Sequence, residues 1–166
     1  MSSLLRMRPR LSLYTGIHVV ISLVGILTGF VVLYGLATSN RRPGWTAAFL
    51  AFTAGTSLTG FGFPFNGITP AFLFGVVSMV VLAVAVTGLY GFRLAGVWRG
   101  LYAGAAVIAL YLNVFVLVVQ GFQKIPALHD LAPQGTEPPF AIAQAVVLLA
   151  FVAFGFLSVR RFHPSV

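Results

Sequence analysis

One histidine stands inside a long apolar run, and it is the side chain of this sequence best suited to chemistry. His18 is the only ionisable residue well within such a run, apart from the tyrosines. Ionisable groups in apolar membrane segments are rare and mark functional sites by default, because burying a charge in hydrocarbon is costly. His18 is therefore a candidate ligand-binding group. The structural alternative is a neutral imidazole that hydrogen-bonds Ser22 or a neighbouring helix.

The residues around His18 follow a helical spacing. Tyr14, His18, Ser22, Gly25 and Gly29 are separated by 4, 4, 3 and 4 residues, which places them on one face of a helix. Two glycines four residues apart form a small-xxx-small pattern that lets two helices approach closely. This face is therefore predicted to contact other helices.

Later segments carry similar faces. One joins Tyr102, Ala106, Ala109, Asn113 and Gln120, and another joins Ala71, Gly75, Ser78 and Ala85. Such faces indicate either helix packing with amide hydrogen bonds or a cavity lined by polar groups. No residue is assigned a catalytic role. The candidate ligand-binding residues are His18, Ser22, Asn113, Gln120, Lys124, His129, Glu137 and Gln144.

The residue inventory argues against several cofactors. Without cysteine there is no disulfide, thiolate metal site or cysteine nucleophile. Haem would need a second axial histidine, and only His129 in a loop and His163 in the tail remain. Zinc or copper would require His18, His129 and a carboxylate to converge. The sequence therefore predicts no metal and no cofactor. It also lacks the phosphate-binding and nucleophile-elbow motifs of common enzymes, so we do not expect an enzyme.

The amino-acid composition indicates that the protein is surrounded by lipid and not by water. Of 166 residues, 59% are hydrophobic and 7% charged, whereas soluble domains carry about 25% charged residues. Lipid suits such a surface, so the fold class is an all-α, polytopic transmembrane helix bundle in a single domain, 1–166. The net charge of +8 comes from basic residues in short connections and tails, where they bind anionic lipid headgroups. Nucleic acid is not an expected partner.

Five apolar runs are long enough to be helices. The second has 19 residues, about 28 Å of helix, but it is rich in serine and threonine. It either crosses the membrane or forms a re-entrant segment beside four crossings. Thr69 and Pro70 are a suitable N-cap and first residue for the third run. The predicted helices are about 13–37, 45–63, 70–92, 100–122 and 139–159.

The basic residues predict orientation, because cytoplasmic loops are enriched in lysine and arginine. Five crossings with the N-terminus outside place six basic residues inside, Arg41, Arg42, Arg93, Arg99, Arg160 and Arg161. The remaining four, Arg6, Arg8, Arg10 and Lys124, are then outside. Four crossings with a re-entrant segment give seven inside and three outside. Both arrangements place the C-terminus in the cytoplasm and loop 123–138 outside. We favour five crossings.

The side of the N-terminus decides the surroundings of His18. With the N-terminus outside, His18 shares its side with seven polar groups that could form a ligand site. With the N-terminus inside, it lies near Arg93 and Arg99. Loop 123–138 is expected to be an amphipathic cap with Leu128 and Leu131 turned to lipid, or else a lid or a surface that docks a partner. The stretch 61–70 is expected to be an interfacial turn or a broken helix lining a site. The seven polar groups are Gln120, Lys124, His129, Asp130, Gln134, Glu137 and Gln144.

Two stretches, LTGFGFPFNGITPA at 58–71 and IALYLNVFVLVVQGFQKIPALHDLAPQGTEPPF at 108–140, resemble a group of small bacterial multi-pass membrane proteins without assigned activity. The resemblance covers most of the chain from about Ile17. It implies a bacterial cytoplasmic (inner) membrane and five helices with a short N-terminus, so the arginine-bearing residues 1–10 are extra here. It carries over no functional residues.

These observations predict a non-enzymatic membrane protein that binds a small apolar or amphipathic ligand between its helices, or a membrane partner. A quinone or a lipid is the expected ligand, with His18, Asn113 and Gln120 orienting its polar head. The alternative is a small homo-oligomeric transporter or channel that assembles through the faces of small residues. Membrane lipids are the expected partners, together with a second copy of the chain or a larger membrane complex.

Overall fold

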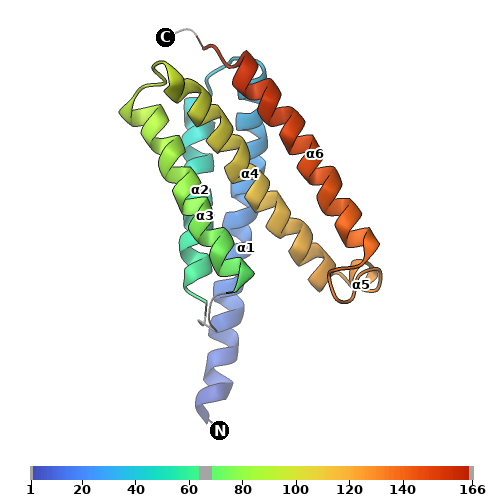
Figure 1. Ribbon diagram of the computed structural model, residues 1–166. Coiled ribbons are helices and arrows are strands. Elements are labelled where there is room, and N and C mark those ends of the chain that lie inside the picture. The colour runs from blue at the N-terminus through green and yellow to red at the C-terminus, as the bar shows by residue number, and fades with distance from the viewer. Residues whose placement is uncertain (1, 64–68, 165–166) are drawn as a thin grey trace.

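The computed structural model describes residues 2–63 and 69–164, and within them the secondary structure is helical, with no strand. A π-helical turn, η1, continues the third helix, and a single-turn helix, α5, precedes the last one (Figure 1). The elements are α1 (Ser2–Ala37), α2 (Pro43–Phe61), α3 (Pro70–Val86), η1 (Thr87–Gly91), α4 (Val97–Lys124), α5 (Pro126–His129) and α6 (Pro138–Arg161).

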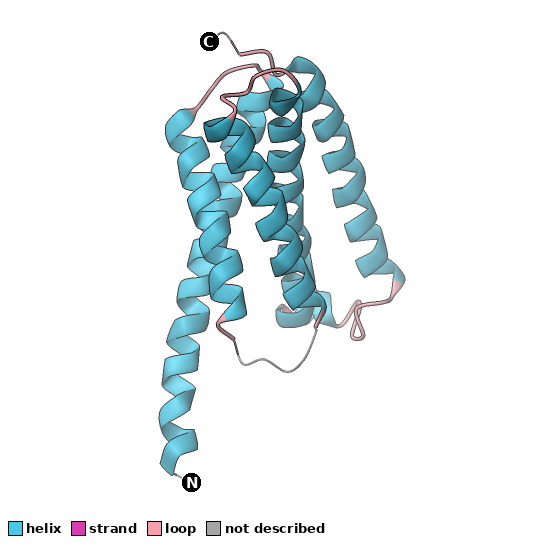
Figure 2. Ribbon diagram, turned by 60° about the vertical axis from the view of Figure 1, so that its left-hand side comes forward, coloured by secondary structure: helices cyan, strands magenta, loops and turns pink. Residues whose placement is uncertain are grey.

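The long helices stand side by side and run alternately in opposite directions, so the bundle has two distinct ends (Figures 1 and 2). α1 begins at one end and α6 finishes at the other. We call the second of these the basic end. It holds the α1–α2 connection, the α3–α4 turn and the end of α6, with Arg41, Arg42, Arg93, Arg99, Arg160 and Arg161.

Four helices in the described part of the chain are long and apolar enough to cross a membrane. This arrangement suggests a membrane protein and agrees with the predicted all-helical class. α2 does not reach the same apolarity, although it is one uninterrupted helix of 19 residues. The four candidate spans are Leu13–Ala37, Phe72–Gly91, Val97–Lys124 and Pro138–Arg161.

Several helix ends differ from those predicted. α1 begins at Ser2 instead of about residue 13, because leucine and arginine favour helix and extending a formed helix is easier than nucleating one. α4 begins at Val97 instead of about residue 100. The third run stops being α-helical at Val86 and continues as the π-helical turn η1. Arg160 and Arg161 belong to α6, where their positive charges suit the C-terminal end of the helix dipole.

The third helix starts as predicted. Thr69 precedes α3 in an extended conformation, and its side-chain oxygen accepts a hydrogen bond of 3.2 Å from the Phe72 backbone N–H. Pro70 is the first helical residue. Residues 64–68, which form the middle of the predicted interfacial turn, lie outside the described part of the chain, as does the side chain of Ala71.

The α1 face with two glycines brings three helices together. A Cβ on Gly25 would lie 3.5 Å from the backbone of Phe52 in α2. A Cβ on Gly29 would lie 2.5 Å from Leu110 Cδ1 in α4 and 2.9 Å from the Phe49 ring in α2. The predicted close approach is therefore confirmed, because a larger residue at position 29 would push against both neighbours.

Candidate functional site

α2 is the polar helix of the bundle, and its hydroxyl groups face the other helices. Thr46, Thr53 and Ser57 are buried, on the same side as Phe49 and Leu50. The three hydroxyl residues are seven and four residues apart, which is the spacing of one helical face. The lower apolarity of α2 thus comes from hydroxyl residues on its inward face, where they can hydrogen-bond to the neighbouring helices. The spacing of these residues is visible in the sequence.

Asn113 is one of these partners. Its side-chain amide donates a hydrogen bond of 3.1 Å to Thr53 Oγ1, which joins α4 to α2. Ser57 Oγ similarly bonds Ser78 Oγ at 3.1 Å and joins α2 to α3. Thr53 is fully buried, and Ser57 and Ser78 are nearly so. The predicted polar faces are thus partly explained by bonds between helices.

His18 also bonds to α2. Its Nδ1 lies 2.7 Å from Thr59 Oγ1, while the Thr59 hydroxyl lies 2.6 Å from the Gly55 carbonyl oxygen. A hydroxyl has one proton, and the Gly55 carbonyl can only accept it, so His18 Nδ1 is the donor to Thr59. The imidazole is then fixed by a neighbouring helix, which was the structural alternative. Ser22 donates to the His18 carbonyl oxygen, not to the ring.

Two glutamines of the predicted site lie on α4 and α6. Gln144 Nε2 donates to the Phe115 carbonyl oxygen at 3.2 Å. The Oε1 atoms of Gln120 and Gln144 are buried without a hydrogen-bond partner among the described residues. Lys124, at the end of α4, is exposed. These groups share the end of the bundle opposite the basic end.

The loop after α4 does not gather around the imidazole. His129 and Asp130 are exposed, and the Glu137 carboxylate accepts 2.9 Å bonds from the backbone N–H groups of Gln134 and Thr136. The bond from Gln134 first, and that from Thr136, hold the pKa of the Glu137 carboxyl below its ordinary value. Within the described residues, the His18 ring hydrogen-bonds Thr59 and none of the seven polar groups expected around it.

The same loop contains the leucines predicted to face lipid. Leu131 is exposed, whereas Leu128 is half-buried and packs beside Gly121 of α4. Across the described residues, no three histidine or acidic side chains form a group that could hold a metal ion. The convergence of His18, His129 and a carboxylate is therefore not seen.

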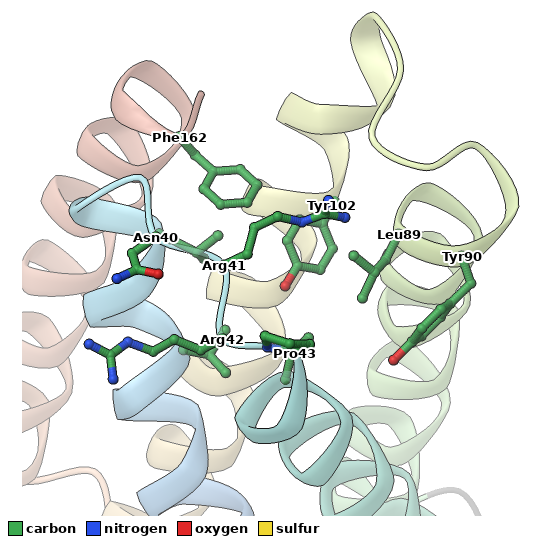
Figure 3. Close-up of a pocket in the computed structure, with 11 residues that line it drawn as sticks. Asn40, Arg41, Arg42, Pro43, Leu89, Tyr90, Tyr102 and Phe162 are labelled. Carbon is green, nitrogen blue, oxygen red and sulfur yellow. The ribbon is translucent and has the colours of Figure 1, made fainter. Parts of the chain in front are cut away.

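A cavity of about 280 Å³ lies at the basic end (Figure 3). It opens between the α1–α2 connection, η1, the start of α4 and the residue that follows α6. Its walls combine apolar side chains with arginine, asparagine and tyrosine. The lining residues are Val32, Leu36, Asn40, Arg41, Arg42, Pro43, Thr46, Leu89, Tyr90, Tyr102 and Phe162.

The two arginines of the cavity point in different directions. In Figure 3 the side chain of Arg41 extends across the cavity toward Tyr102, and its charge acts on that phenol. Arg42 runs the other way, and its guanidinium carbon lies 5.3 Å from the centre of the Tyr34 ring. Arg42 Nε is buried and has no hydrogen-bond partner among the described residues. Arg41 is thus the cation directed at the cavity.

The Tyr102 ring forms the floor of this site. It is almost fully buried, its hydroxyl interacts with Thr46 of α2, and its ring lies 5.8 Å from that of Phe162. Sequence reasoning placed Tyr102 on an inward face but treated Arg41 only as a marker of orientation. The missed signal is a basic residue, Arg41, just before the Pro-Gly start of a helix, where a positive charge lies close to helix N–H donors without a partner inside the helix.

The site offers a cation, tyrosine hydroxyls and apolar walls, which suits binding better than proton or group transfer. No family model, curated protein or solved structure matches this sequence. A function for this protein must therefore be inferred from the geometry of the described residues.

Proposed function

We propose that this protein is a bacterial inner-membrane protein that binds an amphipathic molecule, a lipid or a quinone, in the cavity at its basic end. The observation that carries this proposal is the composition of the cavity. Val32, Leu36 and Leu89 supply apolar contact, whereas Arg41 and Tyr90 supply polar groups. A ligand that has both an apolar and a polar part satisfies both kinds of wall.

The cavity is large enough to enclose part of a lipid, but not a whole lipid molecule. Ligand pockets usually enclose about 300–1,000 Å³, and this one encloses about 280 Å³. It holds a polar head and the first part of an apolar chain. The remainder of the chain then lies against the outer surface of the helices, where exposed Leu101 and Val97 of α4 are apolar.

The proposal includes five crossings with the basic end in the cytoplasm. α2 has 19 residues, enough for about 28 Å, and its second half hydrogen-bonds α1, α3 and α4 through Thr59, Ser57 and Thr53. Its hydroxyl groups are turned toward the other helices, so its modest apolarity does not prevent a crossing. Six arginines at one end favour that end as the cytoplasmic one.

The bonds of His18 and Asn113 support a different role from the one expected. Both side chains hold α2 against its neighbours, so we assign them to the assembly of the bundle. The buried Oε1 atoms of Gln120 and Gln144 have no partner in the part of the chain that the structure describes, so both residues stay as candidates for a second polar contact site.

The experiment measures retained amphiphiles. The protein is purified in detergent, bound lipids and quinones are extracted, and their amount per chain is measured by mass spectrometry. We expect about one amphiphile per chain. Leu89→Trp, which fills the cavity, should lose most of it.

The matched control is Val80→Trp. Val80 is 60% exposed on α3 and does not line the cavity, so the same enlargement there should leave retention unchanged. Equal retention by both variants, or no retention by the wild-type protein, would contradict the proposal.

A further inference from the structure

We infer that the cavity recognises the phosphate group of an anionic amphiphile, with Arg41 as the principal contact. This inference rests on the proposed function and specifies its ligand. A quinone head is neutral and would leave the arginine unpaired, whereas a phosphate matches the planar donor geometry of a guanidinium. Three separate features of the basic end favour the anion.

The first feature is the position of Arg41. Its side chain lies over the cavity with the guanidinium beside Tyr102, as Figure 3 shows. The residue is exposed overall, so its head is free to meet a group arriving from the membrane surface. An arginine at this level of a membrane protein extends naturally to the headgroup region.

The second feature is the start of α2. The helix begins with Pro43, and the N-cap residue Arg42 makes no side-chain capping hydrogen bond among the described residues. The first backbone N–H groups of a helix have no partner inside it, so those of Gly44 and Trp45 are available to an acceptor. The positive end of the helix dipole therefore points to the same rim of the cavity as Arg41.

The third feature is the position of the two acidic residues. The sequence has two acidic residues, Asp130 and Glu137, and both lie at the end opposite the basic end. Neither acidic side chain of the sequence is therefore near enough to Arg41 to neutralise it. An anion from the membrane surface can take that place, and the six arginines attract it there.

The apolar walls distinguish a lipid phosphate from free phosphate. Leu36, Leu89 and Phe162 line the cavity beside Arg41 and gain nothing from a small hydrated anion. They are covered when the phosphate carries an acyl chain. A lipid phosphate and free inorganic phosphate could both pair with Arg41. The site should bind the lipid phosphate more tightly.

The experiment compares four probes on delipidated protein. Phosphatidylglycerol is anionic, phosphatidylcholine has the same phosphate but no net charge, ubiquinone is neutral, and inorganic phosphate lacks a tail. Binding is measured by native mass spectrometry for the amphiphiles and by competition for phosphate. We expect phosphatidylglycerol to bind tightest, and Arg41→Gln to weaken it about tenfold or more, as expected for loss of one charge-assisted hydrogen bond.

Arg93→Gln is the matched control. It removes one positive charge from the same end but lies outside the cavity lining, so it should change binding less than about threefold, a general charge effect of under 1 kcal/mol. Arg41→Lys should restore only part of the affinity, because lysine lacks the bidentate geometry. Both results would support a specific phosphate contact.

Other outcomes separate the two proposals. If the three amphiphiles bind equally and Arg41→Gln matches wild type, the phosphate inference is overturned while amphiphile binding stands. If inorganic phosphate binds as tightly as phosphatidylglycerol, the anion site stands and the amphiphile proposal is wrong. If no probe binds, both are wrong.

Discussion

Gly29 shows how a single missing side chain shapes the core. It lies where α1 meets Phe49 of α2 and Leu110 of α4, both almost fully buried. Gly29→Ala would place a methyl group 2.5 Å from Leu110 Cδ1, so one of the neighbours must move. We expect a loss of about 1–3 kcal/mol in the free energy of unfolding, the usual range for overpacking. Unfolding in detergent micelles measures it.

Gly16→Ala is the control for that substitution. Gly16 lies on the same helix, and a Cβ there would meet nothing within 4 Å. Alanine favours helix over glycine, so this variant should be as stable as the wild type or slightly more stable. Equal destabilisation by both variants would show that helix contact at position 29 does not limit packing.

The hydrogen bonds of the Glu137 carboxylate predict that the order of the loop before α6 depends on pH. Bonds from the Gln134 and Thr136 N–H groups favour the charged carboxylate and lower its pKa. Their contribution to loop order is therefore complete above the ordinary pKa of glutamate, and it is lost as the pH falls through the lowered pKa. Hydrogen-exchange protection of these two amides should show this loss.

Glu137→Gln is the corresponding variant. It keeps the size of the side chain but not the charge, so protection at neutral pH should be weaker and should no longer change with acidification. Protection in the variant that equals the wild type at neutral pH would rule out the carboxylate as the group that orders the loop.

At the scale of the helices, α2 depends on hydrogen bonds to its neighbours. Thr53→Val removes the acceptor of Asn113 and leaves its amide unpaired inside the bundle. We expect a loss of about 0.6–1.7 kcal/mol in the free energy of unfolding, the range found for bonds between membrane helices. Thermal or detergent-induced unfolding provides the measurement.

Thr56→Val is the matched substitution on the same helix. The Thr56 hydroxyl donates to the Phe52 carbonyl oxygen within α2, so its removal breaks a hydrogen bond inside one helix and not one between helices. It should cost less than Thr53→Val. If the two variants are equally stable, the Asn113 bond does not hold α2 and α4 together.

At the scale of the whole molecule, the number of crossings is decided by α2. The chain has no cysteine, so single cysteines at Ser3 and Ala95 can be labelled in intact cells with a membrane-impermeant reagent. Five crossings put three helices between the two positions, so we expect label at Ser3 and none at Ala95. A re-entrant α2 leaves two crossings between them and predicts the same labelling at both.

Thr136 serves as the reference position. It is exposed in the loop before α6 and should be labelled from outside in either arrangement. Labelling at Thr136 with none at Ser3 would contradict five crossings, whereas labelling at Ala95 with none at Thr136 would reverse the proposed orientation.

Much of the fold follows from composition and spacing. Few charges and long apolar runs predict a helical bundle, and Thr69 and Pro70 mark the start of α3, because these features act within one segment. The glycine pair on α1 predicts a close contact for the same reason. The spacing could not identify the partner of Gly29, since that depends on which helices become neighbours.

The sequence by itself thus determined the helices and their inward faces. Only the tertiary structure decided that His18 and Asn113 bond to hydroxyls of α2, and that Arg41 faces Tyr102 over a cavity. The physical reason is that a hydrogen bond or a cavity between helices needs groups from different helices at the same height along the bundle. The relative heights of the helices are fixed by how the helices pack, not by the residues of any one helix.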